Sequence, residues 1–338
     1  MLRNFFAITM LCVSLLAGVT WITASSHPGA IRASYAFQYS NRHCHLVNKR
    51  VRGHRKKVRV CRHKRRHPTP VPPLFDGPSD LVVDAHGNVL VADQLTRSIM
   101  TLSPDGKLLS RWTDAGSKPS SFDQLYGIAL DRYGNVYVSD AAAHLIDKLD
   151  PSGRPLAQWN VNPAEQNSFP TLLAIGNHGD IYVADHAAEA VLHLSSSGAL
   201  LGSIGKGDFV DPYGVAAGPG GNLYVTDFGA GNVREYTPDG SPVAVLGDGA
   251  DGTPQLAKPE AIAVDAQGNI YVSEQAGRLL KLDSTGKILA TWGGTASLTL
   301  SDPSGIALDP QGDIYVSEYG GNRVDKLSPS GDLLTAWQ

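Results

Sequence analysis

The sequence predicts an all-β chain in which residues 76–338 form a six-bladed β-propeller of four-stranded antiparallel blades. Three observations predict it: one repeat occurs six times, its period is 42–47 residues, and each copy holds four short apolar segments separated by turn residues. One such sheet cannot bury both faces alone, whereas six sheets in a ring can, and closure removes most sheet edges. The expected blades span about 77–121, 122–168, 169–210, 211–257, 258–301 and 302–338.

The most regular part of each repeat is a turn followed by a strand. Gly and then Asn or Asp precede three apolar or aromatic residues, a small residue and an acid, as in residues 134–140 (Gly-Asn-Val-Tyr-Val-Ser-Asp). An apolar strand comes before this turn, and a third and a fourth strand follow the acid. Four tryptophans share one place in the fourth strand, and Ile204 and Leu246 take it in the other two repeats; they are Trp112, Trp159, Trp292 and Trp337.

These residues resemble the NHL repeat, with its pattern Pro-x-Gly-hydrophobic-Ala-hydrophobic-Asp, Gly-Asn-hydrophobic-Tyr-Val-x-Asp and Asn-Arg-Val. The resemblance covers residues 77–338 and is specific for the repeat type. It implies an interaction platform, as in ligand-sensing domains of bacterial receptor kinases and in protein- or RNA-binding domains of animal proteins. Related six-bladed propellers include metal-dependent lactonases of the gluconolactonase type and peptide-amidating lyases. The chain shows no RING, B-box or kinase segment, so those multidomain roles are not carried over.

The first residues predict export. Arg3 precedes an uncharged, mostly apolar run from Phe5 to Ala24, with small residues after it and a second processing point after Ala36. We expect residues 1–24 to be a signal peptide, although a run of this length also suits an uncleaved membrane anchor. The protein is therefore expected to be extracytoplasmic, either secreted or tethered to a membrane or cell wall.

Charge divides the chain into two parts. No Asp or Glu precedes Asp76, whereas 14 of the 29 Lys and Arg do, so the remainder carries a formal charge of −17. Residues 25–75 form a basic arm that ends in a Pro-rich linker, and we expect it to be disordered because it can bury little apolar surface. It suits a solvated tether or attachment to anionic lipid or acidic wall polymer. Nucleic acid is disfavoured because no aromatic residues interleave.

The basic arm contains two cysteines, Cys44 and Cys61. In an oxidising compartment such a pair most often forms a disulfide. Free thiols, or a metal clip that uses the neighbouring histidines, remain open alternatives; those histidines are His43, His45 and His63.

A position that all six repeats fill alike serves a need that every blade shares. The acids at the end of the second strand are such a set, and we expect each to accept hydrogen bonds from its own turn rather than to bind a metal. They are Asp93, Asp140, Asp185, Asp227, Glu274 and Glu318.

Positions that differ between repeats indicate a site. The loops before the first strand and after the second are expected to open at one end of the central channel, where the repeats present aromatic, amide, imidazole and carboxylate groups. Asp80 also departs from the Gly, Ala or Leu of its equivalents. The expected binding face comprises Tyr126, Tyr213, Glu260, His186, Phe228, Tyr319, Gln94 and Asp80. A loop-rich face that is merely variable and solvated is the simpler interpretation.

Histidine supplies the only argument for an enzyme. His144 and His186 lie in equivalent loops of adjacent repeats and could share a metal with Asp140 or Asp185, although no third histidine matches them. A nucleophile elbow, a phosphate loop, a dinucleotide fingerprint and a Cys-pair zinc motif are absent. The sequence thus favours a non-catalytic module that binds a protein, peptide or glycan without a cofactor. A metal-dependent hydrolase or lyase is the alternative, and a purely structural wall protein is a third class.

Overall fold

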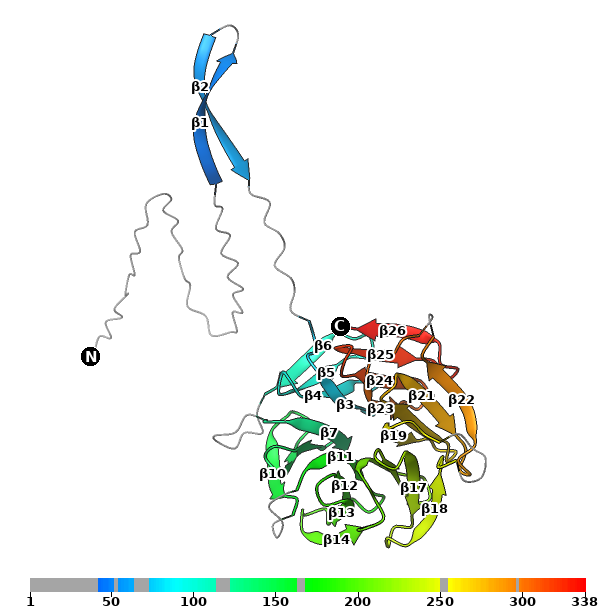
Figure 1. Cartoon of the computed structure of the whole chain (residues 1–338). Helices are drawn as coiled ribbons and strands as arrows, with labels where there is room; N and C mark the ends of the chain where they lie inside the picture. Colours follow the sequence, from blue (N-terminus) through cyan, green and yellow to red (C-terminus); the bar gives the residue numbers. More distant parts are fainter. Residues whose placement is uncertain are drawn as a thin grey trace, which may run out of the picture. The chain divides into compact units, whose positions relative to one another are not determined.

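The computed structural model describes residues 42–51, 54–63, 73–113, 122–162, 168–249, 255–295 and 298–338 (Figure 1). They fall into two compact units that divide between Pro70 and Val71. The expected export signal and most of the Pro-rich linker lie outside the described residues. Within the described ranges, no helix has the length and apolar character needed to cross a bilayer.

The basic arm contains a two-stranded antiparallel hairpin, which differs from the disorder that its composition predicts. β1 (Arg42–Val51) pairs with β2 (His54–His63) along its whole length. The expectation gave too little weight to β-branched residues such as those of residues 58–60 (Val-Arg-Val), which favour extended backbone. The register makes Cys44 and Cys61 direct Cα partners.

Residues 73–338 build six four-stranded antiparallel sheets arranged around an axis, as expected (Figure 1). In each sheet the strands neighbour one another in chain order, so every blade is one continuous repeat. Blades 1 to 3 consist of β3 (Pro78–Val83), β4 (Val89–Asp93), β5 (Ser98–Leu102) and β6 (Leu108–Trp112); β7 (Leu125–Leu130), β8 (Val136–Asp140), β9 (Leu145–Leu149) and β10 (Pro155–Asn160); and β11 (Pro170–Ile175), β12 (Ile181–Asp185), β13 (Ala190–Leu194) and β14 (Leu200–Ile204).

Blades 4 to 6 repeat this arrangement. They consist of β15 (Pro212–Ala217), β16 (Leu223–Asp227), β17 (Asn232–Tyr236) and β18 (Pro242–Leu246); β19 (Pro259–Val264), β20 (Ile270–Glu274), β21 (Arg278–Leu282) and β22 (Ile288–Gly293); and β23 (Pro303–Leu308), β24 (Ile314–Glu318), β25 (Arg323–Leu327) and β26 (Leu333–Trp337).

The hydrophobic core lies between the blades. The second strand of every blade is buried along its whole length, and the fourth strand is largely exposed. Six apolar clusters join neighbouring blades, and one of them joins blade 6 to blade 1 through Tyr315 and Leu81. The core is therefore a closed ring, which explains why a single blade would not be stable.

The repeated tryptophans seal the outer part of each junction. Trp112, in blade 1, lies against Gly153 in the second turn of blade 2, where a Cβ would come within 2.3 Å of the indole. The same contact recurs around the ring. Ile204 and Leu246 make it in the two blades that have no tryptophan, and a Cβ on their partner glycines would lie 3.1 and 3.0 Å away. The sequence position of these side chains thus reflects blade-to-blade packing.

Candidate functional site

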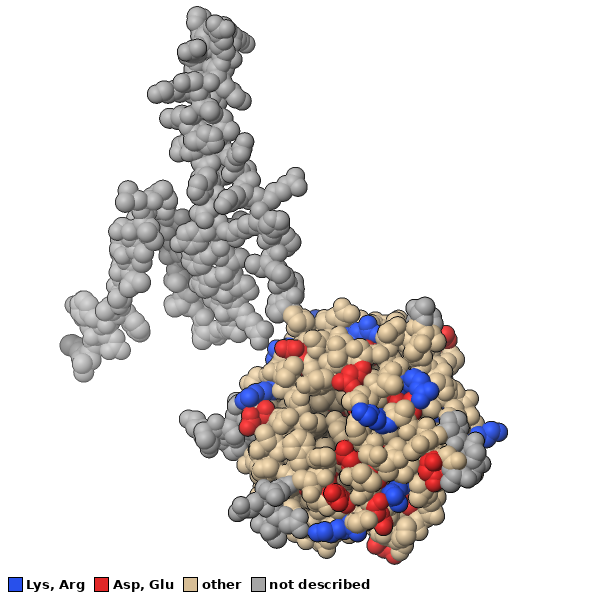
Figure 2. All heavy atoms as spheres, viewed as in Figure 1, with Lys and Arg blue, Asp and Glu red and all other residues tan. Residues whose placement is uncertain are grey.

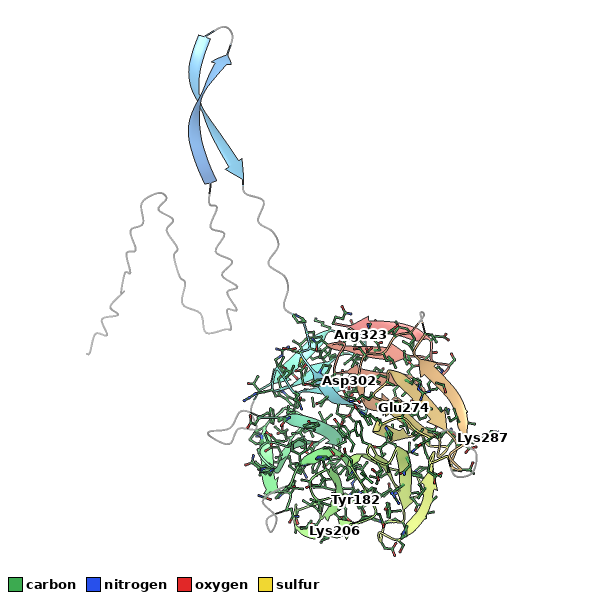
Figure 3. All side chains as sticks on the ribbon, in the orientation of Figure 1. Tyr182, Lys206, Glu274, Lys287, Asp302 and Arg323 are labelled. Atoms are coloured by element: carbon green, nitrogen blue, oxygen red, sulfur yellow. The ribbon has the colours of Figure 1, made fainter. Side chains whose placement is uncertain are left out.

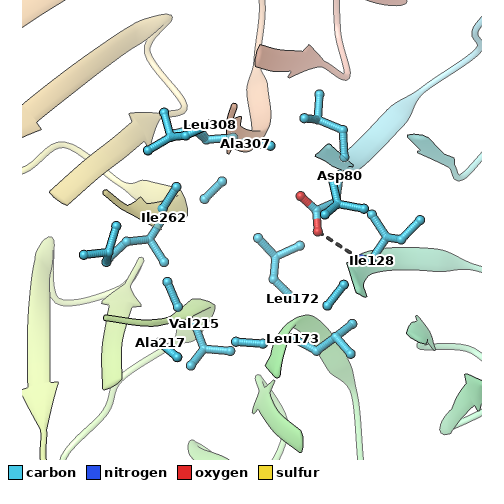
Figure 4. Close-up of a pocket in the computed structure, with 18 of the residues that line it drawn as sticks. Asp80, Ile128, Leu172, Leu173, Val215, Ala217, Ile262, Ala307 and Leu308 are labelled. Carbon is cyan, nitrogen blue, oxygen red and sulfur yellow. Dashed lines mark hydrogen bonds between the residues drawn. The ribbon is translucent and has the colours of Figure 1, made fainter. Parts of the chain in front are cut away.

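The first strands of the six blades enclose a central channel with a volume of about 280 Å³ (Figure 4). Its lining consists of Leu, Ile, Val and Ala side chains together with Asp80. A carboxylate in such apolar surroundings is costly unless its oxygens have partners. Asp80 is therefore the one lining residue that needs a separate explanation.

Asp80 bridges blades inside the channel. Its side chain is 7% exposed, and Oδ2 accepts a hydrogen bond from the Ile128 backbone N–H of blade 2 at 2.9 Å (Figure 4). On the other side, a Cβ at Gly305 of blade 6 would lie 2.7 Å from Asp80 Oδ1. Burial raises the pKa of Asp80 to about 7. The residue expected on the binding face thus lies within the channel, where blades 6, 1 and 2 meet.

We call the loop that precedes the first strand of each blade its leading loop. Next to these loops, side-chain hydroxyl groups form hydrogen bonds between neighbouring blades. In blades 1 and 3 the first strand supplies this hydroxyl. Ser79 Oγ donates to the Leu125 carbonyl oxygen at 3.1 Å, and Thr171 Oγ1 donates to the Tyr213 carbonyl oxygen at 2.7 Å. These small side chains are therefore used in blade-to-blade bonding.

In blades 2 and 4 the hydroxyl comes from the second strand. Ser139 Oγ donates to the Thr171 carbonyl oxygen at 2.5 Å, and Thr226 Oγ1 donates to the carbonyl oxygen of the first strand of blade 5 at 2.6 Å. In blade 5, Ser273 Oγ accepts the Ala261 N–H of the same blade at 2.9 Å. The first-strand positions of blades 2 and 4, Tyr126 and Tyr213, are thereby not needed for bonding between blades, and the equivalent residue of blade 5 is Glu260.

The mouth is the end of the channel at which the leading loops meet the loops after the second strands. Aromatic rings form one side of it. The Tyr126 ring lies edge-on to Phe169 and to Tyr213, with centroids 5.4 and 6.2 Å apart. Phe228 extends this wall from Tyr213 at 6.1 Å, and His186 extends it from Phe169 at 6.0 Å. Edge-to-face packing of this kind keeps aromatic surfaces in fixed positions.

Two carboxylates form the other side. Glu260 is 5% exposed, and within the described part of the chain no hydrogen bond or ion pair reaches its side chain. Burial and the neighbouring charge of Asp302 raise the pKa of Glu260 to about 8. Asp302, which lies near the axis of the ring in Figure 3, has a buried Oδ1 without a partner among the described residues, and burial raises its pKa. Burial and the charge of Glu260 also raise the pKa of Tyr213.

The leading loops on this side hold strained backbone. Lys258 and Asp302 occupy equivalent places immediately before a proline, and both have positive φ, at 53° and 55°. Such a conformation is unfavourable for residues other than glycine and persists only where the surroundings enforce it. Lys258 Nζ lies 3.2 Å from Gln275 Oε1 and 5.3 Å from the centre of the Phe228 ring. The lysine is therefore directed toward the aromatic side of the mouth.

The six repeated carboxylates bind the loops rather than the channel. Asp140 accepts the N–H groups of Asp123 and Gln124 in its leading loop at 2.7 and 2.9 Å. In blade 5 the longer Glu274 accepts one such N–H, from Ala257 at 2.7 Å, and pairs with an arginine of the third strand. Their partners thus include the leading loop as well as the turn that follows. This carboxylate fixes the loop that carries the variable residues.

The two candidate metal-binding histidines have separate partners. His144 Nδ1 contacts the Ser168 carbonyl oxygen, whereas His186 Nδ1 lies 2.5 Å from Asp211 Oδ1. Across the described ranges, no group of three or more His, Cys, Asp or Glu is placed to hold a metal ion. The structure therefore does not assemble His144 and His186 with Asp140 or Asp185 into one ligand set.

The internal comparison of repeats found much of the mouth but overlooked one position. The structure brings Tyr126, Tyr213, Phe228 and Glu260 together, and Tyr319 Oη donates to Gln94 Oε1 at 2.9 Å across the junction of blades 6 and 1. The overlooked residues stand directly before the first strand. That place also varies among the repeats, with only Asp occurring twice, which is the signal that would have found it, and its contributors to the mouth are Phe169, Lys258 and Asp302.

Comparison with known families gives the repeat its name. A family model for the NHL repeat matches residues 300–327, which include the first three strands of blade 6. The chain is a six-bladed β-propeller, and a segment of its sixth blade matches the NHL repeat. A second family model, for the N-terminal part of strictosidine synthase-like proteins, matches residues 252–282 of the propeller, which include Glu260.

One curated protein that is similar to part of this chain is described as a lyase. Peptidyl-alpha-hydroxyglycine alpha-amidating lyase 1 of Drosophila melanogaster is 30% identical over 96 residues, which are 26% of this chain and 18% of that protein. The match thus spans less than a fifth of the curated relative.

Solved structures agree on the fold. A streptogramin B lyase structure is 17% identical, with a TM-score of 0.59 over 80% of this chain and 85% of that one. A catalytically inactive virginiamycin B lyase from Staphylococcus aureus with quinupristin is 17% identical, with a TM-score of 0.58 over 79% and 83%. A putative gluconolactonase is 21% identical, with a TM-score of 0.57 over 73% and 87%. At these identities the likeness shows the fold alone, and one architecture hosts many functions.

Proposed function

We propose that the propeller is an extracytoplasmic binding module that takes a small organic ligand, or one end of a peptide or glycan, at the mouth of the channel. The main support is Glu260, a buried carboxylate without a partner in the described part of the chain. An unpaired buried carboxylate destabilises a protein unless something else offsets its desolvation. A bound ligand would do so.

The repeats differ in which first-strand side chains bond to a neighbouring blade, and this difference supports the same site. Ser79 and Thr171 are used in bonds between blades, whereas Tyr126 and Tyr213 are not, because the second-strand hydroxyls of Ser139 and Thr226 take that role. Tyr126 and Tyr213 belong to the aromatic side of the mouth, and Glu260 belongs to the acidic side together with Asp302. A concave site with a few polar groups at an apolar wall is typical of small-ligand recognition.

A metal-dependent hydrolase or lyase is the second candidate. It draws on the printed descriptions of the amidating lyase, the streptogramin B lyase and the putative gluconolactonase. The binding proposal needs no metal ligand set, and it uses the side chains that the structure brings together. An activity screen with lactones, cyclic esters and amidated peptides, with and without added divalent metal, separates the two: turnover that depends on metal would favour the enzyme.

A ligand screen tests the proposal directly. The full chain is melted in the presence of amines, carboxylic acids, sugars, short peptides and neutral aromatic compounds, since a ligand of the native state raises the melting temperature. We expect at least one class to stabilise the wild type, and Tyr126→Ala to remove that effect. Tyr133→Ala is the matched control, because Tyr133 is 68% exposed in the first turn of blade 2. A screen without any stabilising compound would overturn the proposal.

A further inference from the structure

Glu260 and Asp302 are two acidic side chains that have no positively charged partner among the described residues. They come from adjacent blades at the mouth, and the charge of Asp302 raises the pKa of Glu260. No hydrogen bond or ion pair to either side chain occurs among the described residues, and one oxygen of Asp302 is fully buried. Two neighbouring carboxylates without a counter-ion repel one another. The site therefore lacks a positive charge.

The nearby cations of the protein are committed elsewhere. Arg278 Nε donates to Glu274 at 2.6 Å, and Arg323 Nε donates to Glu318 at 2.7 Å. The charge of Lys258 lowers the pKa of Glu260, but its Nζ is held by the Gln275 amide oxygen and lies over the Phe228 ring. Arg278 and Arg323 are thus each paired with a repeated carboxylate, and Lys258 contacts the aromatic side of the mouth. Among the described residues no cation pairs with Glu260 or Asp302, so a ligand is the source of positive charge that we infer.

The shape of the site selects the kind of cation. A metal ion would need a further ligand, and no group of three suitable side chains occurs in the described ranges. The wall opposite the acids is aromatic, and aromatic faces attract organic cations and bury their apolar parts. Because Glu260 is 5% exposed, only a small charged head can reach it. A primary ammonium is smaller than a guanidinium or a quaternary ammonium and carries three donors for carboxylate oxygens.

The geometry points to a primary ammonium group on an apolar or aromatic carbon skeleton as the ligand of the mouth, with its charge between Glu260 and Asp302 and its skeleton against Tyr126 and Tyr213. The inference rests on the proposed function and names its ligand class. The formal charge of −17 on residues 76–338 would attract such a ligand over a distance. The same chemistry occurs in free amines and in lysine side chains of peptides.

Binding of this cation is coupled to the release of a proton. The pKa of Glu260 is about 8, so its carboxyl is largely protonated at neutral pH, and an ammonium beside it favours the ionised form. The groups that face Glu260 are Asp302 and Lys258 from the leading loops and Tyr213 from β15; Asp80 acts on Tyr213 from β3. Only Lys258 among them is positive, and it is present in both the free and the bound protein. The released proton is therefore assigned to the two carboxyls.

Titration calorimetry on the full chain tests the inference. The probes are 2-phenylethylamine, pentylamine and Nα-acetyl-lysine amide, and the neutral control is 2-phenylethanol. We expect at least one amine to bind saturably, with proton release seen as a dependence of the heat on the ionisation enthalpy of the buffer. Glu260→Gln should weaken it by about 10- to 100-fold, as for the loss of a charged hydrogen bond. Preference for the first two probes would indicate a free amine, and preference for the third a lysine side chain.

The outcomes separate this inference from the proposed function. If no amine binds while a neutral or anionic compound stabilises the protein in a way that depends on Tyr126, the mouth is a binding site and the ammonium inference is wrong. The inference is also wrong if 2-phenylethanol binds as tightly as 2-phenylethylamine, or if Glu260→Gln leaves amine affinity unchanged. If no compound of any class binds, both fail.

Discussion

Trp337 of β26 lies directly against Gly106, in the turn between β5 and β6, where a Cβ would come within 2.1 Å of the indole Nε1. This contact joins blade 6 to blade 1, and the same contact joins the other neighbouring blades with Trp, Ile or Leu. Charged side chains of both signs are scattered over the face of the ring seen in Figure 2. Closure of the ring thus relies on apolar packing between blades, to which the fourth-strand side chains contribute.

Gly106→Ala is expected to open this junction. Gly106 has φ of 82°, so alanine adds backbone strain of about 1–2 kcal/mol and also a steric clash. Gly268→Ala is the matched control, because Gly268 has the same φ and no atom within 4 Å of its Cβ position. Chemical unfolding should show a larger loss for Gly106→Ala, and in a Trp337→Ala background the two losses should become equal. Equal losses in the wild-type background would contradict the packing account.

Ser139→Ala is expected to break the bond between blades 2 and 3. Ser139 Oγ accepts the Gly127 N–H at 2.8 Å and donates to the Thr171 carbonyl, so both buried backbone groups would lose a partner, at about 1–3 kcal/mol. Adding Tyr126→Ser should recover part of the loss, because blades 1 and 3 bond through that position. Unfolding free energies measure both effects, with the exposed Ser197→Ala as control. If Tyr126→Ser recovers no stability, this would contradict the account in which the hydroxyl between blades comes from either the first or the second strand.

The hairpin predicts a disulfide. Direct partners on antiparallel strands have Cα atoms about 4.5–5.5 Å apart, a distance that a disulfide can span, and Cys44 and Cys61 are such partners. Mass spectrometry of the non-reduced protein should show the sulfurs of Cys44 and Cys61 protected from alkylation and two hydrogens missing. Cys44→Ser should leave one reactive thiol. Alkylation of both cysteines without reduction would show free thiols, and protection that a chelator removes would show a metal clip.

The raised pKa of Glu260 makes stability depend on pH in a defined direction. A carboxyl whose pKa is about 8 in the folded chain and near 4.5 in the unfolded chain binds a proton more tightly when folded. Its contribution is present at low pH and is lost as pH rises through 8. Glu260→Gln removes this dependence, so its advantage over the wild type should grow by up to about 4 kcal/mol between pH 5 and pH 9. The measurement is denaturant unfolding at both pH values.

A matched control isolates Glu260 from the other buried carboxyls. Asp80 also titrates near pH 7, but it is present in both proteins and its effect cancels in the difference. Glu189→Gln replaces an exposed carboxylate and should leave the difference between pH 5 and pH 9 unchanged. A constant difference between wild type and Glu260→Gln would contradict the burial of an unpaired carboxyl at the mouth.

The fold could be predicted because the repeat fixes it six times over. Spacing, turn residues and the tryptophan position each follow from blade packing, and the structure confirms six blades of four strands. The hairpin escaped prediction because charge dominated the composition, although residues 58–60 already alternate β-branched and basic side chains. Local composition thus underestimated backbone pairing.

The mouth could be predicted in part. Comparison of equivalent positions singled out Tyr126, Tyr213 and Glu260, because variation among otherwise identical blades marks a special environment. It could not show that Glu260 lacks a partner or that Asp302 lies beside it, since both depend on side chains from adjacent blades. It also placed Asp80 on the binding face, whereas the residue lies in the channel and bonds to blade 2. Register and loop conformation decide these points.

The central claim is that an ionised Glu260 binds an ammonium at the mouth, and the pH dependence of amine affinity tests it most directly. The dissociation constant of the tightest amine probe is measured on the full chain at pH 6, 7 and 8, where the amine itself stays protonated. Because the competent fraction of the site follows ionisation of a carboxyl with pKa about 8, affinity should rise about 50-fold from pH 6 to pH 8. Glu260→Gln should abolish this rise. An affinity that is flat across this range, or that falls as pH rises, would contradict the account.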